Sequence, residues 1–451
     1  MRWLVSLGIA IVLVGCYRRH EGEGGGPTAR DDASRRDGGS VEPPRRDGGS
    51  TPPARRDGGS DGETPLPPES FEDPGPDARP SDDPEAAGWG DRPDLDPDEP
   101  CCEPVGAPVD IPFADAPWGI PAIEWNGDGW GVLYPREASA FQQLDRDGAR
   151  VGPVRDLAQR AATGEDLGFE WAAGRFFAVL PGELPGENLV GLLDRRGVRA
   201  VDWVDRGTIY GVAFVYHHYR WIALRRSRGR RGLGAVEVVE LDPRLDEVAA
   251  VTAVEGDDLR MRPTPVGVVG LKSRAVGFVG EGATLRTYVI EVPVARPLQE
   301  LEPVTLESAP GTLTARATRL RDRAVLVQGP QDGVRGAVVE VDAFTGTLAR
   351  HPWPASLPSA WGQEEINGAA GLDVHDLVAA CANYTDAAGG TGPGVLLRLL
   401  GPDGEVVGAP VIVEEGAYGC SVGTDGARVF VAWPRRGSGA VRVQAYRVRG
   451  G

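Results

Sequence analysis

Lysine and histidine are scarce in this chain. Lys272 is the single lysine among 48 basic residues, and only five residues are histidines. With so few histidines, we find no convincing general base for a serine or cysteine nucleophile. The G-x-S-x-G, P-loop and dinucleotide-binding motifs are missing as well, and no cysteine spacing resembles a zinc site. The sequence therefore predicts no catalytic residue, no cofactor and no metal.

Positive charge is also in deficit. The chain has 66 acidic residues against 48 basic ones, which gives a formal net charge of −18. This net negative charge repels the phosphates of a nucleic acid, and it disfavours binding that depends on release of the nucleic acid's counterions. We therefore expect no nucleic-acid partner. A cation or a basic partner is easier to accommodate.

Long apolar runs are missing except at the N-terminus. Residues 4–14 form one apolar run behind Arg2. The run is too short to span a bilayer as a permanent helix, and it has the length of the apolar part of a secretory signal. We therefore expect residues 1–15 to be a signal peptide that is removed.

The end of this run, Leu13-Val14-Gly15-Cys16, resembles the lipobox of bacterial lipoproteins. The resemblance implies that Cys16 is lipidated and that its acyl chains attach the protein to a membrane. In Gram-negative lipoproteins, an aspartate after this cysteine usually marks retention at the inner membrane. Tyr17 stands there instead. The resemblance thus implies the outer membrane or cell surface of a Gram-negative bacterium.

Residues 16–100 contain almost no clustered apolar residues. The string RRDGGS occurs there three times, at 35–40, 45–50 and 55–60. Such a segment cannot bury enough apolar surface to offset the entropy of an ordered chain. We predict that it is a disordered tether between the lipidated cysteine and a folded domain at 101–451.

Helical periodicity is nearly absent from this domain, and short apolar runs recur instead with a period near 50. The runs begin at Trp130, Phe176, Trp221, Ala275, Ala324, Leu377 and Val429. Most follow a turn rich in Gly, Asp, Asn or Arg, and several units then show a third strand that ends in another turn. A fixed period of this length, with several short strands per unit, predicts a β-propeller.

A related string marks the fourth strand of some units. VGPVRDL at 151–157 and VGAPVIV at 407–413 follow a third strand, and VGAPVDI at 105–111 precedes the first unit. The seventh unit stops at Gly451 without a fourth strand. We therefore expect the strand at 105–111 to complete the last unit and close the ring, which leaves no unpaired end blade.

The predicted fold class is all-β: a seven-bladed β-propeller of four-stranded blades over residues 101–451, preceded by a signal peptide and a disordered linker. The domain resembles the degenerate, Trp-rich propeller repeats common in bacterial surface lipoproteins. No family motif such as the WD dipeptide recurs regularly. We expect the propeller to be monomeric.

Four cysteines remain besides Cys16. Cys381 ends the second strand of unit six and Cys420 begins unit seven, so that both fall on the same face of a propeller. We predict a disulfide between them, with Cys101 and Cys102 as a vicinal or terminal clasp. The alternative is buried free thiols and a mobile N-terminal pair.

Glu124 and Glu170 occupy equivalent places beside Trp125 and Trp171 on two adjacent inner strands. Paired carboxylates beside aromatic platforms are what a glycosidase would use. In the third unit Val215 takes the position, so that no further acid continues the series. The alternative is a repeated structural position whose glutamate bonds to the backbone of a neighbouring blade.

Acidic residues also precede every unit, on the segments that join an outer strand to the next inner strand. They are Asp115, Glu165, Asp166, Asp205, Asp258, Glu307, Glu364, Glu365, Glu414 and Glu415. They could form an acidic funnel for a cation or a basic partner, or simply a solvated face.

One arginine-rich loop interrupts this acidic chain. Arg225, Arg226 and Arg228, with Arg230 and Arg231, belong to the string RRSRGRRG. The loop should project from the same face as the acidic residues, where it could neutralise part of their charge. Alternatively, it binds sugar acids or phosphate itself.

These features favour a membrane-anchored surface lipoprotein whose propeller is a binding or scaffold module for proteins or glycans, not an enzyme. The alternatives are a propeller enzyme that acts on extracellular polysaccharide and a purely structural protein of the cell envelope. Propellers host all three classes, so the fold alone does not decide between them.

Overall fold

A computed structural model describes residues 90–112, 120–134, 139–157, 168–181, 188–229, 234–256, 263–310, 315–330, 335–354, 361–386, 394–435 and 439–450. The predicted signal peptide, the predicted lipidation site Cys16 and the RRDGGS repeats lie outside these residues. Within the described ranges, no helix is long and apolar enough to cross a membrane.

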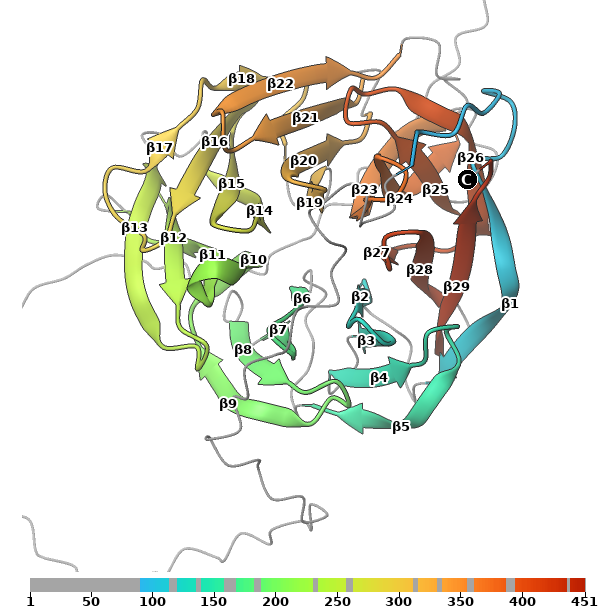
Figure 1. The fold of residues 1–451 in the computed structure, drawn as a ribbon, viewed down its shortest axis with the longest axis horizontal. Helices are drawn as coiled ribbons and strands as arrows, with labels where there is room; N and C mark the ends of the chain where they lie inside the picture. Colours follow the sequence, from blue (N-terminus) through green and yellow to red (C-terminus); the bar gives the residue numbers. More distant parts are fainter. Residues whose placement is uncertain are drawn as a thin grey trace, which may run out of the picture. The chain divides into compact units, whose positions relative to one another are not determined.

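The described strands form seven antiparallel sheets arranged in a ring (Figure 1). Blade 1 comprises β2 (Ala122–Trp125), β3 (Trp130–Tyr134), β4 (Ala140–Leu144) and β5 (Arg150–Asp156). Blade 2 comprises β6 (Phe169–Ala172), β7 (Arg175–Pro181), β8 (Asn188–Leu193) and β9 (Arg199–Asp205). Blade 3 comprises β10 (Thr208–Val215), β11 (Arg220–Ser227), β12 (Ala235–Leu241) and β13 (Glu247–Glu255). The short 3-10 helix η1 (Tyr216–His218) lies in the turn between β10 and β11.

Blades 4 to 6 repeat this order. Blade 4 comprises β14 (Thr264–Gly270), β15 (Arg274–Glu281), β16 (Thr284–Glu291), β17 (Gln299–Glu300) and β18 (Val304–Thr305). Blade 5 comprises β19 (Ala315–Leu320), β20 (Arg323–Gln328), β21 (Ala337–Asp342) and β22 (Thr347–Pro352). Blade 6 comprises β23 (Trp361–Leu372), β24 (Leu377–Asp386), β25 (Gly394–Leu400) and β26 (Val406–Glu415). In blade 4 both β17 and β18 pair with β16, so the outer strand is split in two.

Blade 7 joins the two ends of the described chain. It comprises β27 (Ser421–Thr424), β28 (Arg428–Arg435), β29 (Ala440–Val448) and β1 (Cys102–Pro112). β1 pairs with β29 in antiparallel register from Cys102 opposite Val448 to Pro112 opposite Ala440. The predicted seven-bladed fold and its closure by the N-terminal strand are therefore confirmed.

The seven repeat positions found in the sequence all lie at the start of the second strand of a blade, and each is at most 1% exposed. Aromatic residues at these positions link neighbouring blades. The Trp130 ring stacks on Phe430 of blade 7 with centroids 4.0 Å apart, and Phe177 lies 4.9 Å from Trp221 of blade 3. The repeated apolar runs thus form the interfaces between blades.

Several turns between the third and fourth strands share one aspartate geometry. The Oδ1 of Asp145 accepts the backbone N–H of Asp147 and of Ala149, at 2.9 and 2.8 Å. Asp194 accepts two N–H groups in the same way in blade 2, and Asp242 does so in blade 3. The aspartate side chain replaces backbone partners in the turn, which explains the recurring "LD" strings of the sequence.

Part of the segment predicted to be a disordered tether is ordered. The prediction covers residues 16–100, but residues 90–101, here called the strap, lie against blade 6. The Gly90 N–H donates to the Val374 carbonyl at 2.8 Å, and Leu95 packs against the core of blades 6 and 7. The strap is rich in Asp and Pro, so its composition indicated disorder. Backbone pairing and ion pairs with blade 6 hold it instead.

Replacement of Ile111 by alanine tests the closure of the ring. Ile111 is fully buried in β1 beside the core of blades 7 and 1. We expect Ile111→Ala to lower the free energy of unfolding by about 2–5 kcal/mol, because it leaves a cavity where the ring closes. Val105→Ala is the control on the same strand, since Val105 is 39% exposed. Equal losses in urea unfolding for both variants would contradict this account of the closure.

Candidate functional site

The two predicted glutamates lie in different interfaces between blades. Glu124 in β2 pairs with Gly131, and Glu170 in β6 pairs with Phe177. A Cβ on Gly131 would meet Phe176 of blade 2 at 2.6 Å, whereas Phe177 contacts blade 3.

Paired residues of antiparallel strands project to the same side of a sheet. Glu124 therefore faces blade 2 and Glu170 faces blade 3, with the sheet of blade 2 between them. The two carboxylates do not face each other across a shared cleft, as the acid and nucleophile of a glycosidase must.

The neighbouring tryptophans are used in packing. The ring centroids of Trp125 and Trp130 are 4.9 Å apart, and those of Trp171 and Phe176 are 4.5 Å apart in an edge-on arrangement. Strand pairing also corrects the alignment of blade 3. The residue equivalent to Glu124 is Ala213 rather than Val215, because η1 lengthens the hairpin turn between β10 and β11.

The sequence left two interpretations of the acidic residues that precede each unit, a funnel or a solvated face, and the structure describes six of the ten residues. Glu414 accepts a hydrogen bond from Trp433 Nε1 at 2.7 Å, Glu307 lies 3.4 Å from Arg350, and Asp205 accepts the Gly207 N–H. These carboxylates have protein partners. Four further predicted members, Asp115, Glu165, Asp166 and Asp258, lie outside the described residues.

Of these acidic residues, Glu364 differs most from the expected solvated position. It forms an ion pair with Arg398, Oε1 to Nη2 at 2.5 Å, and both side chains are only 2% exposed. The Arg398 guanidinium also lies over the Trp353 ring, 5.4 Å from its centroid. The sequence placed Glu364 on a solvated face, but the pair is buried between blades 5 and 6.

The arginine-rich string divides into paired and unpaired residues. Arg225 donates from Nη2 to Glu237 at 2.8 Å and from Nη1 to Glu247 at 2.7 Å. Burial alone would lower the pKa of Arg225, but its hydrogen bonds to Glu247 and Glu237 raise that pKa above its ordinary value. No described residue pairs with the guanidinium of Arg226 or Arg228. The predicted Arg230 and Arg231 lie outside the described residues.

A shallow hollow adjoins these arginines where blades 2 and 3 meet. It has a volume of about 370 Å³ and is lined by Asp205, Arg206, Gly207, Arg225, Arg226, Ser227, Glu237 and Glu247. Arg206 is held in place by the Leu245 carbonyl, which accepts from Nη2 at 2.7 Å. The hollow therefore combines fixed charges of both signs with one arginine, Arg226, that has no described partner.

The disulfide prediction is confirmed for one pair of cysteines. Cys381 and Cys420 are bonded, with Cα atoms 6.2 Å apart, and they link blade 6 to blade 7. Cys101 and Cys102 are buried free thiols, so the expected clasp between them is wrong. A hydrogen bond between the two thiols lowers the pKa of Cys101 and raises that of Cys102, which burial raises further.

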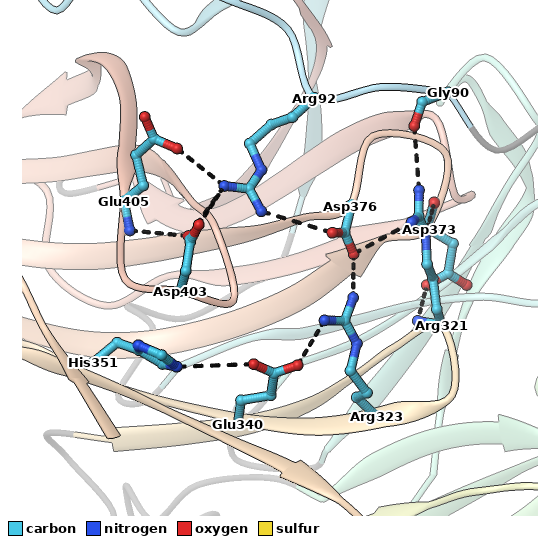
Figure 2. A network of polar contacts seen from close by, with 10 residues as sticks. All are labelled: Gly90, Arg92, Arg321, Arg323, Glu340, His351, Asp373, Asp376, Asp403 and Glu405. Atoms are coloured by element: carbon cyan, nitrogen blue, oxygen red, sulfur yellow. Dashed lines mark hydrogen bonds and ion pairs between the residues drawn. The ribbon is translucent and has the colours of Figure 1, made fainter. Parts of the chain in front are cut away.

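A network of charged side chains joins the strap to blades 5 and 6 (Figure 2). Arg92 Nη1 donates to Asp403 and Glu405 at 2.9 and 3.0 Å, and Arg92 Nη2 lies 3.7 Å from Asp376. Asp376 is also paired with Arg323 of blade 5. One carboxylate thus connects two blades and the strap.

Arginines on neighbouring hairpins make similar contacts elsewhere in the ring. Arg428 Nη2 donates to the Arg146 carbonyl of blade 1 at 2.8 Å, and Arg274 Nη1 donates to the Ala343 carbonyl of blade 5 at 2.9 Å. The sequence carried a signal for this set that we missed. An arginine stands immediately before five of the seven repeat positions: Arg175, Arg220, Arg274, Arg323 and Arg428.

In the part of the chain that the structure describes, no group of three or more His, Cys, Asp or Glu residues is placed to hold a metal ion. His217 and His218 lie in η1, which buries none of its residues.

The comparison with solved structures found proteins similar to this chain, two of which are described here. The β-propeller domain of Myceliophteria thermophila Cps50 (Swd1) is 15% identical and matches with a TM-score of 0.49, covering 74% of this chain and 99% of that chain. The WD40 repeats of RRP9 are 11% identical, also with a TM-score of 0.49, covering 77% of this chain and 100% of that chain. No protein-family model matches this chain, and a search of curated proteins gave no match.

Removal of one member of the buried ion pair tests its structural role. We expect Glu364→Gln to lower the free energy of unfolding by about 3–5 kcal/mol, because Arg398 would remain buried without a counter-charge. Combined Glu364→Leu and Arg398→Met should recover much of this loss. Glu415→Gln, at an exposed carboxylate of β26, should change stability by less than about 0.5 kcal/mol in urea unfolding. A loss no larger than that of the Glu415 variant would refute the role.

The strap network should weaken in acid. Burial opposes ionisation of Asp403, but hydrogen bonds from Arg92 and the Glu405 amide outweigh it and hold the pKa below its ordinary value. A carboxyl with a lowered folded-state pKa stabilises the fold above its unfolded pKa, and this contribution disappears as the pH falls through the folded value.

We therefore expect Asp403→Asn to lower the melting temperature at pH 7. The difference from the unaltered chain should shrink once the pH falls below about 4. Asp94→Asn, at an exposed strap residue that no described residue pairs with, should show no such difference at any pH. If the difference in melting temperature between Asp403→Asn and the unaltered chain did not change with pH, the stabilising role of ionised Asp403 would be contradicted.

Proposed function

We propose that this protein is a lipid-anchored binding or scaffold module of the outer membrane or cell surface, not an enzyme. Its propeller would bind a protein or glycan partner that presents carboxylates or phosphates. Residues 1–15 would direct export, Cys16 would carry the acyl chains, and the chain between Cys16 and the strap would connect membrane and propeller.

The observation that carries this proposal is the hollow between blades 2 and 3. Arg226 lines it without a described partner, and exposed Arg228 lies beside it. Fixed partners hold Arg225 and Arg206, so the surroundings of Arg226 are already ordered before a ligand arrives. A ligand that pairs with Arg226 therefore does not have to order the neighbouring arginines as well, which lowers the entropy cost of binding.

The polysaccharide-enzyme alternative has less support. It rests on Glu124 and Glu170, which the strand register places on opposite sides of blade 2. The tryptophans beside them are packed against core aromatic rings. A purely structural role in the envelope would leave Arg226 and Arg228 without a function.

A photo-crosslinking experiment tests the proposal. A benzophenone amino acid replaces Ser227 in the hollow, and the full chain is expressed in a Gram-negative host and irradiated in intact cells. We expect an outer-membrane protein whose crosslinked product falls about tenfold when Arg226→Glu and Arg228→Glu reverse the local charge, since a close ion pair contributes at least 1.4 kcal/mol.

Arg195→Glu with Arg196→Glu is the matched control. These two exposed arginines of blade 2 have side chains that are 60% and 64% exposed, and the variant carries the same change of charge. The control should leave the crosslinked product unchanged. Products lost equally in both variants, or a protein found in the cytosol, would overturn the proposal.

A further inference from the structure

Three outer strands of the propeller contain the same backbone bulge. Gly106 of β1, Gly152 of β5 and Gly408 of β26 have φ values of +70°, +68° and +68°. In each strand a valine precedes the glycine, and five residues of the outer strand span three residues of the neighbouring strand. The register shifts lie between Val105 and Val109, between the partners Phe141 and Gln143, and between the partners Leu397 and Leu399.

On blade 6 the strap fills this bulge. The Ala409 N–H donates to the Glu99 carbonyl at 2.6 Å, and the Ala409 carbonyl accepts the Cys101 N–H at 2.8 Å. Pro100 is thereby paired with Ala409 in a parallel bridge. A Cβ on Gly408 would lie only 2.8 Å from the Glu99 oxygen, and Val407 beneath the strap is 5% exposed.

On blades 7 and 1 the same bulge is open. Among the residues that the structure describes, a Cβ on Gly106 or on Gly152 would meet nothing within 4 Å. The valines that precede these glycines, Val105 and Val151, are 39% and 41% exposed, in contrast to the buried Val407 of blade 6. An exposed edge with an uncovered apolar side chain is a template for pairing with another chain.

The two open bulges differ in what they can bind. By the shared register, Ala107 of blade 7 and Pro153 of blade 1 occupy the position of Ala409. Ala107 has both the N–H and the carbonyl that the strap uses on blade 6. Pro153 has no N–H and cannot donate. Of the two open bulges in the described residues, the one in blade 7 has the complete set of backbone groups that blade 6 uses.

We propose that the outer edge of blade 7 at Val105–Gly106–Ala107 is a docking site for an extended segment of a partner protein. The segment binds as the strap binds on blade 6, by addition to an exposed strand edge. A carbonyl of the segment accepts the Ala107 N–H, and the N–H two residues later donates to the Ala107 carbonyl. A small apolar side chain at this later residue covers Val105, as Cys101 covers the equivalent valine.

The middle residue of such a segment can be proline. In the strap this residue is Pro100, whose position in the bridge needs no N–H. Proline at this point also prevents the segment from extending its pairing along the edge.

The occupant is assigned to another protein because this chain already uses its own strap. Residues 99–101 of each copy are bound on its own blade 6. Exchange between two copies would only replace one intramolecular contact by the same contact between chains. This site is separate from the arginines of blade 3, so it can fail or hold independently of the proposed function.

The probe for this site is a blocked synthetic peptide with the sequence of residues 93–101 and serine in place of Cys101. The full chain is examined by hydrogen exchange with and without millimolar peptide. We expect exchange in the fragment at 105–109 to slow about threefold, because occupancy of the edge protects its amides. Exchange in the fragment at 151–155 of blade 1 should not change.

Two controls separate docking from general effects. Ala107→Pro removes the donor in the way that Pro153 does in β5, so the fold should tolerate it, and the peptide should no longer slow exchange. A peptide N-methylated at its last residue should fail on the unaltered chain. The proposal would be overturned if exchange still slowed in both controls, or if the unmodified peptide did not slow exchange in the unaltered chain. A dimer of the chain that Ala107→Pro dissociates would overturn it as well.

Discussion

Antiparallel pairing of β1 with β29 is the contact on which the ring depends. Eight residue pairs join the first and last described strands, from Cys102 opposite Val448 to Pro112 opposite Ala440. Each blade buries its faces against two neighbours, so an open ring would expose two apolar sheet faces. The position of β1 also determines the path of the strap. The strap precedes β1 directly in the chain, and it therefore lies against the neighbouring blade 6.

Ion pairs and hydrogen bonds between turns reinforce this closure. Arg428 links blade 7 to blade 1, and Asp376 links blade 6 to both blade 5 and the strap. Most of these side chains are partly exposed, so each pair contributes little by itself and the benefit comes from their connection into a network. The Cys381–Cys420 disulfide adds a covalent link between blades 6 and 7. The closed ring is thus held together both in its core and along its turns.

The candidate site illustrates where reasoning from sequence stops. The repeats placed Glu124 and Glu170 at equivalent positions, which is correct, and equivalence is the reason that they do not meet. Equivalent residues on successive blades face successive interfaces. Glu364 was grouped with solvated acids because its partner Arg398 is distant in the sequence and belongs to another strand. Pairing across strands depends on register, and periodicity alone does not supply register.

The sequence by itself determined the class of fold, the number of blades and the closure of the ring, because these follow from repeated apolar runs and a displaced fourth strand. It also indicated the disulfide between Cys381 and Cys420. Only the tertiary structure decided which charged residues are buried in pairs, where the strap lies and which edge bulges remain open. Those features depend on contacts between residues far apart in the chain, such as Arg92 with Asp403 and Glu99 with Ala409. No local pattern encodes them.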